Sequence, residues 1–528
     1  MLNNAGFFRK ESKGYLLILG YLGIFLMLVG ALCLIPLVII PFDYDNSFKY
    51  LPHFIITGLT SIAIGAIPYF LFVFKRKLVS LRRYQDAILI VSIWIVTILV
   101  NAIPLATSGL PNMNYATSIF EMVSGYTTTG VTVMGNVDII PKIFLLQRVI
   151  IQAFGGIGLI LVITTAFNGR IGMKLFKAEG HSETILPNLA KTARVIVLIY
   201  LAFITLGTIA FLLAGMNFFE AFSFAVSCIS TGGFSVVQGN IHSYNSLTIE
   251  IICMVLMMIG AISFYFHLSF ATGKFKKLFD TQTIVFLSIC VFLPLLISLL
   301  LVPASLEASL TTTLDVNIKN YGDALRYTSF QVISAATTTG LISVKTLSGL
   351  PEGMLSIMCI LIIIGGCSGS TAGGLKVSRL IIVCKGIFFN LKEQLGSKRI
   401  VDTHYVKRYG VDEEITKDSI VSSISYILLY FGVIAVGMLS LAILNPSHNF
   451  GDSFFEAASL TGGVGFGLVI EPLANYANLW ISMILMLLGR LEILIIFVAF
   501  YCVGRDISGS VRALRIRKTR GESADNSN

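Results

Sequence analysis

Ten apolar runs, each long enough to cross a membrane as a helix, constrain this chain more than any other feature of its sequence. A hydrocarbon layer about 30 Å thick needs about 20 consecutive apolar helical residues. The 528-residue chain meets this requirement at 15–41, 54–74, 86–106, 143–167, 195–215, 248–271, 281–303, 354–384, 418–444 and 477–503. Only 12% of the residues are charged, about half the fraction usual in soluble domains. The pattern predicts an all-α polytopic membrane protein and excludes a soluble enzyme, a disordered chain and a fibrous protein.

Lys and Arg residues are distributed unequally between the segments that join these runs. Ten spans place both termini on one side of the membrane, and the segments on that side hold 29 of the 38 basic residues. The opposite connections and helix ends hold six. Since cytoplasmic segments are enriched in Lys and Arg, we predict a multi-pass protein of the cytoplasmic membrane with both termini in the cytoplasm. This topology accounts for the net charge of +10, so no nucleic-acid partner is expected.

Four Thr/Ser/Gly clusters lie between alternate spans and can be aligned with one another on their last glycine. They read SGYTTTG (124–130), SCISTGG (227–233), SAATTTG (334–340) and SLTGGVG (459–465), with a serine six positions before each last glycine. Each cluster follows a segment that is too short or too polar to cross the membrane. A repeat of about 100 residues is a whole folding unit. We therefore expect four pseudo-symmetric helix–pore-loop–helix repeats around one central pore, preceded by two N-terminal transmembrane helices.

The position of these clusters after short helices indicates a cation site. A half-helix that ends near mid-membrane directs the negative end of its dipole at that point. Irregular backbone at this depth is tolerated only inside protein or facing water. Four such loops around one axis would present rings of carbonyl oxygens that can replace the water of an ion. The alternative of ordinary Gly/Thr-rich loops would explain one cluster better than four clusters at one phase.

Two acidic residues precede these clusters at matching positions. Glu121 and Glu456 lie nine positions before the last glycine, where the other two repeats have Phe224 and Gln331. These carboxylates are either ion ligands or polar groups near helix starts at the outer surface. We favour the second interpretation.

The run at 354–384 is interrupted by small and polar residues. The interruption comprises Gly365, Gly366, Cys367, Ser368, Gly369, Ser370, Thr371, Ala372, Gly373 and Gly374. Such residues break a helix or allow close helix packing of the GxxxG kind. A phosphate-binding loop is excluded because the G-x-x-x-x-G-K-[ST] pattern is not met. We favour a flexible intramembrane loop below the clusters that obstructs the pore and must move during conduction.

Three basic residues lie inside candidate spans, and Arg490 occupies the most informative position. Each repeat has a glycine 24–27 positions after its cluster glycine, and the next residue is Gly156, Ala261, Gly366 or Arg490. A charge at membrane depth is costly unless it faces water or a partner. We expect Arg490 to project into the pore; a salt bridge with Glu492 or a neighbouring helix is the alternative. Lys376 and Arg379 are expected near the cytoplasmic mouth, where they either reach the lipid headgroups or contact a regulatory subunit.

The clusters also resemble a known family. TTTGVT, STGGFS, TTTGL and TGGVGFGL are similar to the four filter segments of the Trk/Ktr/HKT superfamily of potassium transporters. GGCSGSTAGGLKVSR (365–379) resembles the broken-helix signature of the third repeat, and LLGRLEI (487–493) resembles the last helix of Trk-type subunits. The resemblance covers roughly residues 85–505 and, with the two extra N-terminal spans, favours a Trk-type ion-translocating membrane subunit.

This resemblance implies potassium uptake through a filter in which backbone carbonyls just before each cluster glycine coordinate the ion. The implied filter residues are Thr128, Thr129, Gly130, Thr231, Gly232, Gly233, Thr338, Thr339, Gly340, Gly463, Val464 and Gly465. Some plant relatives with raised sodium permeation have serine in place of the first glycine, so Gly130 implies potassium preference. The fourth segment has no side-chain hydroxyl just before its last glycine, which departs from the threonine-rich pattern.

The resemblance further implies a homodimer in membrane lipid and a cytoplasmic TrkA-like regulatory subunit with nucleotide-binding domains. NAD(H) or ATP/ADP is expected on that partner only, and no cofactor is expected on this chain. The basic segments 168–194, 385–417 and 504–528 are candidate docking surfaces. The expected units are an N-terminal pair of helices (1–84), four repeats (85–194, 195–280, 281–417 and 418–505) and a basic tail (506–528).

Two other functions are weighed against potassium uptake. A sodium-permeable or sodium/proton-coupled symporter would use the same loops, although the filter glycines argue against a strict sodium pathway. A polytopic membrane enzyme would need His, Asp, Glu or Cys residues grouped at one membrane depth, and the spans lack such a group. His267, the one histidine well inside a predicted span, is expected to form a hydrogen bond within the helix bundle rather than to act in catalysis.

Overall fold

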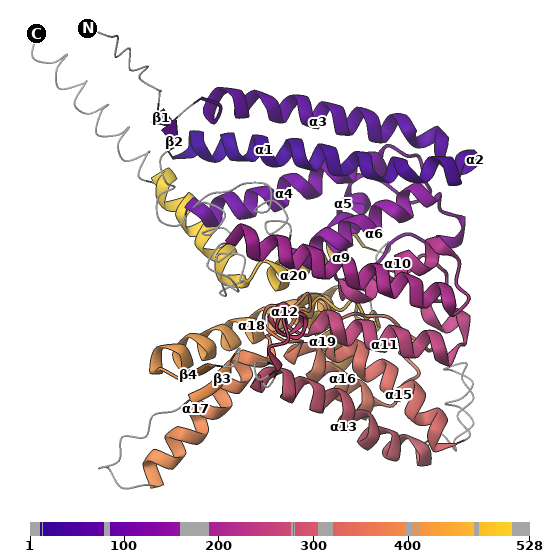
Figure 1. Ribbon diagram of the computed structural model, residues 1–528, viewed down its shortest axis with the longest axis vertical. Coiled ribbons are helices and arrows are strands. Elements are labelled where there is room, and N and C mark those ends of the chain that lie inside the picture. The colour runs from indigo at the N-terminus through magenta and orange to yellow at the C-terminus, as the bar shows by residue number, and fades with distance from the viewer. Residues whose placement is uncertain are drawn as a thin grey trace, which may run out of the picture.

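The computed structural model describes residues 11–12, 14–75, 77–78, 85–158, 189–275, 278, 280–304, 320–395, 405–408, 411–468 and 475–508. Long helices run side by side in roughly one direction, from the α1/α3 pair at one edge to α13 at the other (Figure 1). Six of the described helices are long and apolar enough to cross a membrane, and two further pairs qualify if each bent pair is one span. The chain therefore has the polytopic helical architecture that the sequence predicts.

The N-terminal unit is a hairpin of two helices. α1 (Tyr15–Leu34) continues as a 3-10 segment (Ile35–Phe42), in which Pro36 and Pro41 favour departure from α-helical geometry. α2 (Tyr44–Ser47) and a short 3-10 turn (Phe48–Tyr50) lead into α3 (Leu51–Phe72). β1 (Glu11–Ser12) pairs in parallel with β2 (Lys77–Leu78).

Glycines allow α1 and α3 to pack closely. A Cβ atom on Gly23 would lie 2.5 Å from the carbonyl oxygen of Gly65, and the reverse contact has the same length. Gly30 and Gly58 approach in the same way one heptad along. Small residues at such contacts let helix backbones approach in a membrane, where van der Waals packing stabilises the pair.

We expect Gly65→Ala to destabilise this hairpin by about 1–3 kcal/mol, the usual cost of overpacking. The measurement is the thermal unfolding of the purified protein in detergent. Gly432→Ala on α18 is the matched control, because no atom lies within 4 Å of a Cβ at that position. Equal melting temperatures for the two variants would contradict the close-packing interpretation.

The rest of the described chain forms four helix–loop–helix repeats. Repeat 1 has α4 (Gln85–Ala106), α5 (Tyr115–Tyr126) and α6 (Lys142–Ile157). Repeat 2 has α9 (Leu189–Leu213), α10 (Phe218–Ile229), α11 (Leu247–Ala261) and α12 (Phe264–Ala271). Repeat 3 has α13 (Thr281–Ala304), α15 (Tyr321–Ala336), α16 (Glu352–Ile364) and α17 (Val377–Leu395). Repeat 4 has α18 (Lys417–Leu444), α19 (Phe450–Gly462), α20 (Tyr476–Arg490) and a last helix (Ile493–Ser508).

The helices that follow the clusters differ from the predicted spans. α11 and α12 meet at 99°, and α20 and the last helix meet at 104°, so the spans predicted at 248–271 and 477–503 qualify only as bent pairs of helices. In repeat 3 the chain leaves α16 and re-enters a helix only at Val377, which confirms the predicted interruption. The predicted span at 143–167 extends beyond Gly158, outside the described residues.

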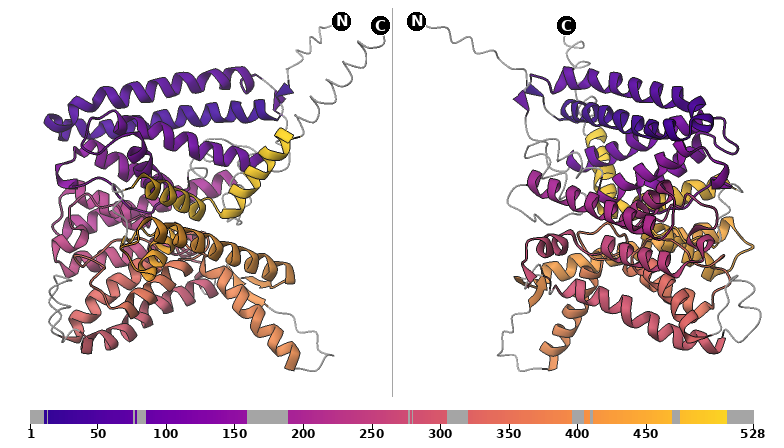
Figure 2. Two further views of the ribbon diagram at one scale, coloured as in Figure 1. Left: turned by 180° about the vertical axis from the view of Figure 1, so that it is seen from behind. Right: turned by 45° about the vertical axis from the view of Figure 1, so that its right-hand side comes forward.

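The two ends of the described chain lie on the same side of the helix bundle. The hydroxyl of Tyr15 at the start of α1 donates a hydrogen bond to Asp506 in the last helix, at 2.8 Å. β1 contacts β2, which follows α3. Figure 2 shows α17 extending away from the bundle, and the β3–β4 hairpin (Tyr405–Arg408 and Val411–Glu414) follows it. Most of the candidate docking segments 168–194 and 504–528 lies outside the described residues.

Candidate functional site

Four short helices, α5, α10, α15 and α19, end at the four predicted clusters. The residue two positions before each cluster glycine has a positive φ, and so has the glycine itself. The φ values are 55° at Thr128, 51° at Thr231, 55° at Thr338 and 69° at Gly463, followed by 84° at Gly130, 75° at Gly233, 83° at Gly340 and 79° at Gly465. Because left-handed conformation alternates with negative φ, consecutive carbonyl groups are turned in similar directions.

The four clusters contact one another in a closed ring. A Cβ atom on Gly130 would overlap the carbonyl oxygen of Gly232 in the next repeat. The same overlap relates each cluster glycine to the residue before the next one, in the pairs Gly233–Thr339, Gly340–Val464 and Gly465–Thr129. Only glycine leaves room for these carbonyls, which explains the residue on which the repeats align.

The residue before each cluster glycine is held by the same backbone hydrogen bond. Its N–H donates to the carbonyl of the serine that the sequence placed six positions before the glycine. The distances are 2.9 Å for Thr129–Ser124, 3.0 Å for Gly232–Ser227, 2.9 Å for Thr339–Ser334 and 2.9 Å for Val464–Ser459. The fourth segment thus keeps the backbone geometry of the others. Its departure from the threonine-rich pattern changes side chains only.

Glu121 and Glu456 do not lie at helix starts near the outer surface, so the favoured interpretation of these residues is wrong. Both side chains are fully buried, seven residues into α5 and α19. Glu121 accepts hydrogen bonds from the backbone beyond Gly130, and Glu456 accepts one from Leu468 at 2.7 Å. Their carboxylates are bound to the chain that leaves the ring, rather than directed into it.

The starts of these helices show a signal that the sequence interpretation missed. Each of the four has an asparagine at its N-cap, namely Asn114, Asn217, Asn320 and Asn449. The side chain of Asn114 accepts from Thr117 N at 3.1 Å, and that of Asn217 accepts from Glu220 N at 2.9 Å. Asparagine is a favoured N-cap residue, so the recurrence before all four clusters could have located the helix starts.

The predicted intramembrane loop lies against the inner side of the ring. The chain from Gly365 to Lys376 is not helical, which rules out the alternative of a GxxxG packing helix. The Thr371 hydroxyl lies 2.9 Å from the carbonyl oxygens of both Ile229 and Gly260. Gly373 N donates to the hydroxyl of Thr338 at 2.7 Å. The loop is therefore bonded directly to the second and third clusters.

Arg490 binds this loop and the end of α6 in repeat 1. Its guanidinium donates to the carbonyl oxygen of Thr371 at 2.9 Å, of Gly156 at 3.2 Å, and of Gly155. Glu492, which the sequence suggests as a partner of Arg490, pairs with Arg379 at 2.7 Å. Arg490 thus connects three repeats at the level where the matching residues of the others are small.

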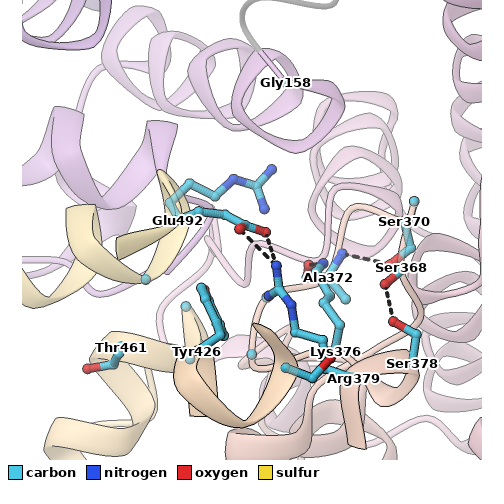
Figure 3. Close-up of a pocket in the computed structure, with 18 of the residues that line it drawn as sticks. Gly158, Ser368, Ser370, Ala372, Lys376, Ser378, Arg379, Tyr426, Thr461 and Glu492 are labelled. Carbon is cyan, nitrogen blue, oxygen red and sulfur yellow. Dashed lines mark hydrogen bonds and ion pairs between the residues drawn. The ribbon is translucent and has the colours of Figure 1, made fainter. Parts of the chain in front are cut away.

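A cavity of about 270 Å³ lies beside the ring, the segment 365–374 and Arg490. Its lining includes Thr127 and Gly463 from the clusters, and Gly373, Lys376 and Arg490 below them. Figure 3 shows Lys376, Arg379 and Glu492 around this cavity, with the ion pair between Arg379 and Glu492. Among the described residues, four basic side chains (Lys376, Arg379, Arg408 and Arg490) and the carboxylate of Glu492 line this cavity.

Lys376 and Arg379 both form contacts within the protein. The ammonium of Lys376 donates to the carbonyl of Ala372 within the loop. Arg379 forms two hydrogen bonds with Glu492 and lies 3.8 Å from the ring centroid of Tyr426. Both side chains are engaged inside the protein. The expectation for His267 is confirmed, since its Nε2 lies 2.9 Å from the carbonyl oxygen of Ile259.

Thr371→Val should release the loop from its position under the ring. The variant keeps the bond from the backbone N–H of residue 371 to the Gly260 carbonyl but removes the hydroxyl partner of the Ile229 carbonyl. Losing a buried hydrogen-bond partner costs about 1–3 kcal/mol, so we expect cation flux through purified protein in liposomes to rise about tenfold. Thr208→Val is the matched control, because that hydroxyl bonds only to Ile204 in its own helix among the interactions described. Flux that is equal in the two variants would contradict a restraining role for Thr371.

Together, the polytopic helical fold and the closed ring of backbone carbonyls define a class of membrane protein that transports cations. Residues 51–505 match the TrkH family, described as cation transport protein. The chain belongs to this family, which consists of transport proteins rather than enzymes.

Individual relatives agree with this assignment along most of the chain. It is 30% identical to the Trk system potassium uptake protein TrkH of Halomonas elongata, over 92% of this chain and 98% of the relative. It is 29% identical to an uncharacterized cation transporter of Methanocaldococcus jannaschii, over 93% of this chain and 96% of the relative. The crystal structure of the potassium transporter TrkH from Vibrio parahaemolyticus superposes with a TM-score of 0.77 at 26% identity, covering 92% of this chain and 98% of that one.

Proposed function

We propose that this chain takes up potassium across the cytoplasmic membrane through the closed ring of cluster carbonyls. The observation that carries the proposal is the set of contacts in which each cluster glycine abuts a carbonyl of the next repeat. Carbonyl rings can replace the hydration shell of a potassium ion. The relatives from Halomonas elongata and Vibrio parahaemolyticus are a potassium uptake protein and a potassium transporter, which supports the same ion.

The proposed ion ligands are backbone oxygens at two levels. One level comprises the carbonyls of Thr129, Gly232, Thr339 and Val464, and the other those of Thr128, Thr231, Thr338 and Gly463. Gly130, Gly233, Gly340 and Gly465 leave room for them, and no carboxylate is required. The helix ends of α5, α10, α15 and α19 add the negative ends of four dipoles.

The proposed gate is the segment 365–374 together with Arg490. In the conformation described, hydrogen bonds hold this segment against the ring, and the Arg490 guanidinium lies beside the cavity below. A positive charge there disfavours a resident cation. Conduction would require the segment to leave the ring and Arg490 to lose its bond to Thr371.

We also propose that the chain works as a homodimer with a cytoplasmic TrkA-like subunit, which binds NAD(H) or ATP/ADP. Several relatives are proteins of a Trk potassium uptake system, which supports a multi-component assembly. Both termini and the segments 168–194, 385–417 and 504–528 would face that subunit. The projection of α17 away from the bundle suits this arrangement (Figure 2).

The test is complementation of a bacterial strain that lacks potassium uptake. Growth at low potassium and Rb⁺ uptake are measured with and without the TrkA-like subunit, and membrane insertion is verified by immunoblot. The proposal expects growth and Rb⁺ uptake that persist when sodium is present in excess over Rb⁺. Correct insertion without rescue under either condition would overturn it, and uptake driven only by sodium would favour a coupled symporter.

A further inference from the structure

A buried arginine on α6 has no part in the ion pathway proposed above. The Nε atom of Arg148 lies 3.3 Å from Oε2 of Glu121 on α5, and the two side chains are 2% and 0% exposed. A buried charge is strongly unfavourable unless an opposite charge and further partners compensate it. The other contacts of these two residues therefore indicate what the pair does.

Glu121 holds the chain that leaves the first filter segment. Its Oε1 accepts from the N–H groups of Val133 at 2.5 Å and Met134 at 3.2 Å, and from the hydroxyl of Thr132 at 2.7 Å. These residues begin only two positions after Gly130. The position of the first filter segment is thus fixed from its outer end by one carboxylate.

Arg148 extends this support to the second filter segment. Its guanidinium carbon lies 4.1 Å from the ring centroid of Phe234, which directly follows Gly233 and is 1% exposed. A cation over an aromatic face is attracted to it, more strongly where water is excluded. Arg148 therefore bonds to repeat 1 on one side and to repeat 2 on the other.

The residues that align with Glu121 in the other repeats explain why repeat 2 needs this support. In repeat 3, Gln331 donates to the hydroxyl of Ser343 at 3.3 Å, and in repeat 4, Glu456 accepts from Leu468 N at 2.7 Å. Repeat 2 has Phe224 at this position, which has no polar group to hold the outgoing chain. The stacking of Arg148 on Phe234 supplies a contact from the neighbouring repeat.

We infer that Arg148 is a specificity-determining positioning residue: paired with Glu121 and stacked on Phe234, it keeps two adjacent quarters of the filter at the spacing that favours potassium over sodium. The inference rests on the proposed function. Selectivity in carbonyl filters depends on the size of the cage and on the number and field of its dipoles. A ring in which Thr129 and Gly232 can shift would discriminate less well.

The experiment uses the double variant Glu121→Gln/Arg148→Met, which removes both charges and leaves neither unpaired. Purified protein in liposomes is assayed for Rb⁺ uptake and for the sodium concentration that halves it. We expect this concentration to fall about tenfold, an effect typical of residues that act on a site through others. Phe234→Leu leaves the ion pair in place and should also lower the sodium concentration that halves Rb⁺ uptake.

The matched control is Glu250→Gln/Arg326→Met, which removes a 2.7 Å ion pair between α11 and α15 and should leave sodium inhibition unchanged. Selective Rb⁺ uptake by the wild type, with the same sodium inhibition in the control, the double variant and Phe234→Leu, would overturn the inference alone. Absence of Rb⁺ uptake by inserted wild-type protein would overturn the proposed function, and the inference with it.

Discussion

Gly340→Ala is expected to lower Rb⁺ uptake about 100-fold and to reduce the preference for potassium over sodium. A Cβ at this position would overlap the carbonyl oxygen of Val464, and the residue has a φ of 83°. An overpacked, well-ordered site costs about 1–3 kcal/mol, to which the left-handed conformation adds about 1–2 kcal/mol for a residue with a Cβ. The carbonyl of Val464 must move, and the ring then no longer matches the ion.

The control for this variant is Gly322→Ala in α15 of the same repeat, where no atom lies within 4 Å of a Cβ. It should keep wild-type uptake and wild-type sodium inhibition. Uptake is measured on equal amounts of inserted protein, so that a change in expression is not read as a change in conduction. If Gly340→Ala transported Rb⁺ as selectively as Gly322→Ala, the close contact around the ring would have no functional role.

Arg490→Ala is expected to raise Rb⁺ flux on the order of 100-fold in the absence of the regulatory subunit. Hydrogen bonds that involve a charged group contribute about 1.5–3 kcal/mol each, and Arg490 donates to Thr371, Gly155 and Gly156. Their loss frees the segment 365–374 and removes a positive charge beside the cavity. Deletion of 367–373 should change flux in the same direction.

The control is Arg505→Ala in the last helix, an exposed arginine whose described partner is Asp506. In the absence of the TrkA-like subunit, flux should stay at the wild-type value in this control. An inserted, correctly folded Arg490→Ala protein with unchanged flux and unchanged dependence on the subunit would exclude Arg490 from the gate.

The backbone of the filter was predictable because it depends on local sequence. A positive φ at Gly130, Gly233, Gly340 and Gly465 follows from a residue type that reaches this conformation without steric cost, and the serine six positions earlier marks the same hydrogen bond in each repeat. The fourth segment could be aligned from that phase, although its side chains differ. The break at Gly365 was predictable for the same reason.

The side-chain partners were not predictable, since they depend on how distant helices are oriented. The sequence favours a surface position for Glu121, because nothing in its own helix places Arg148 beside it. Arg379 and Glu492 lie 113 residues apart, so the sequence offered the adjacent Arg490 as the partner of Glu492 instead. The bends at Ile262 and Leu491 interrupt apolar runs that contain no proline, and hydrophobicity alone therefore does not reveal them.

The central claim is that the four filter segments form one cation site, and the location of bound Rb⁺ tests it most directly. Crystals of the protein grown in Rb⁺ can be measured at the Rb absorption edge to locate the ion by anomalous scattering. The account predicts a peak on the axis of the ring, between the carbonyls of Thr129, Gly232, Thr339 and Val464. A well-ordered ring without a peak, with Rb⁺ bound elsewhere in the membrane region, would contradict it.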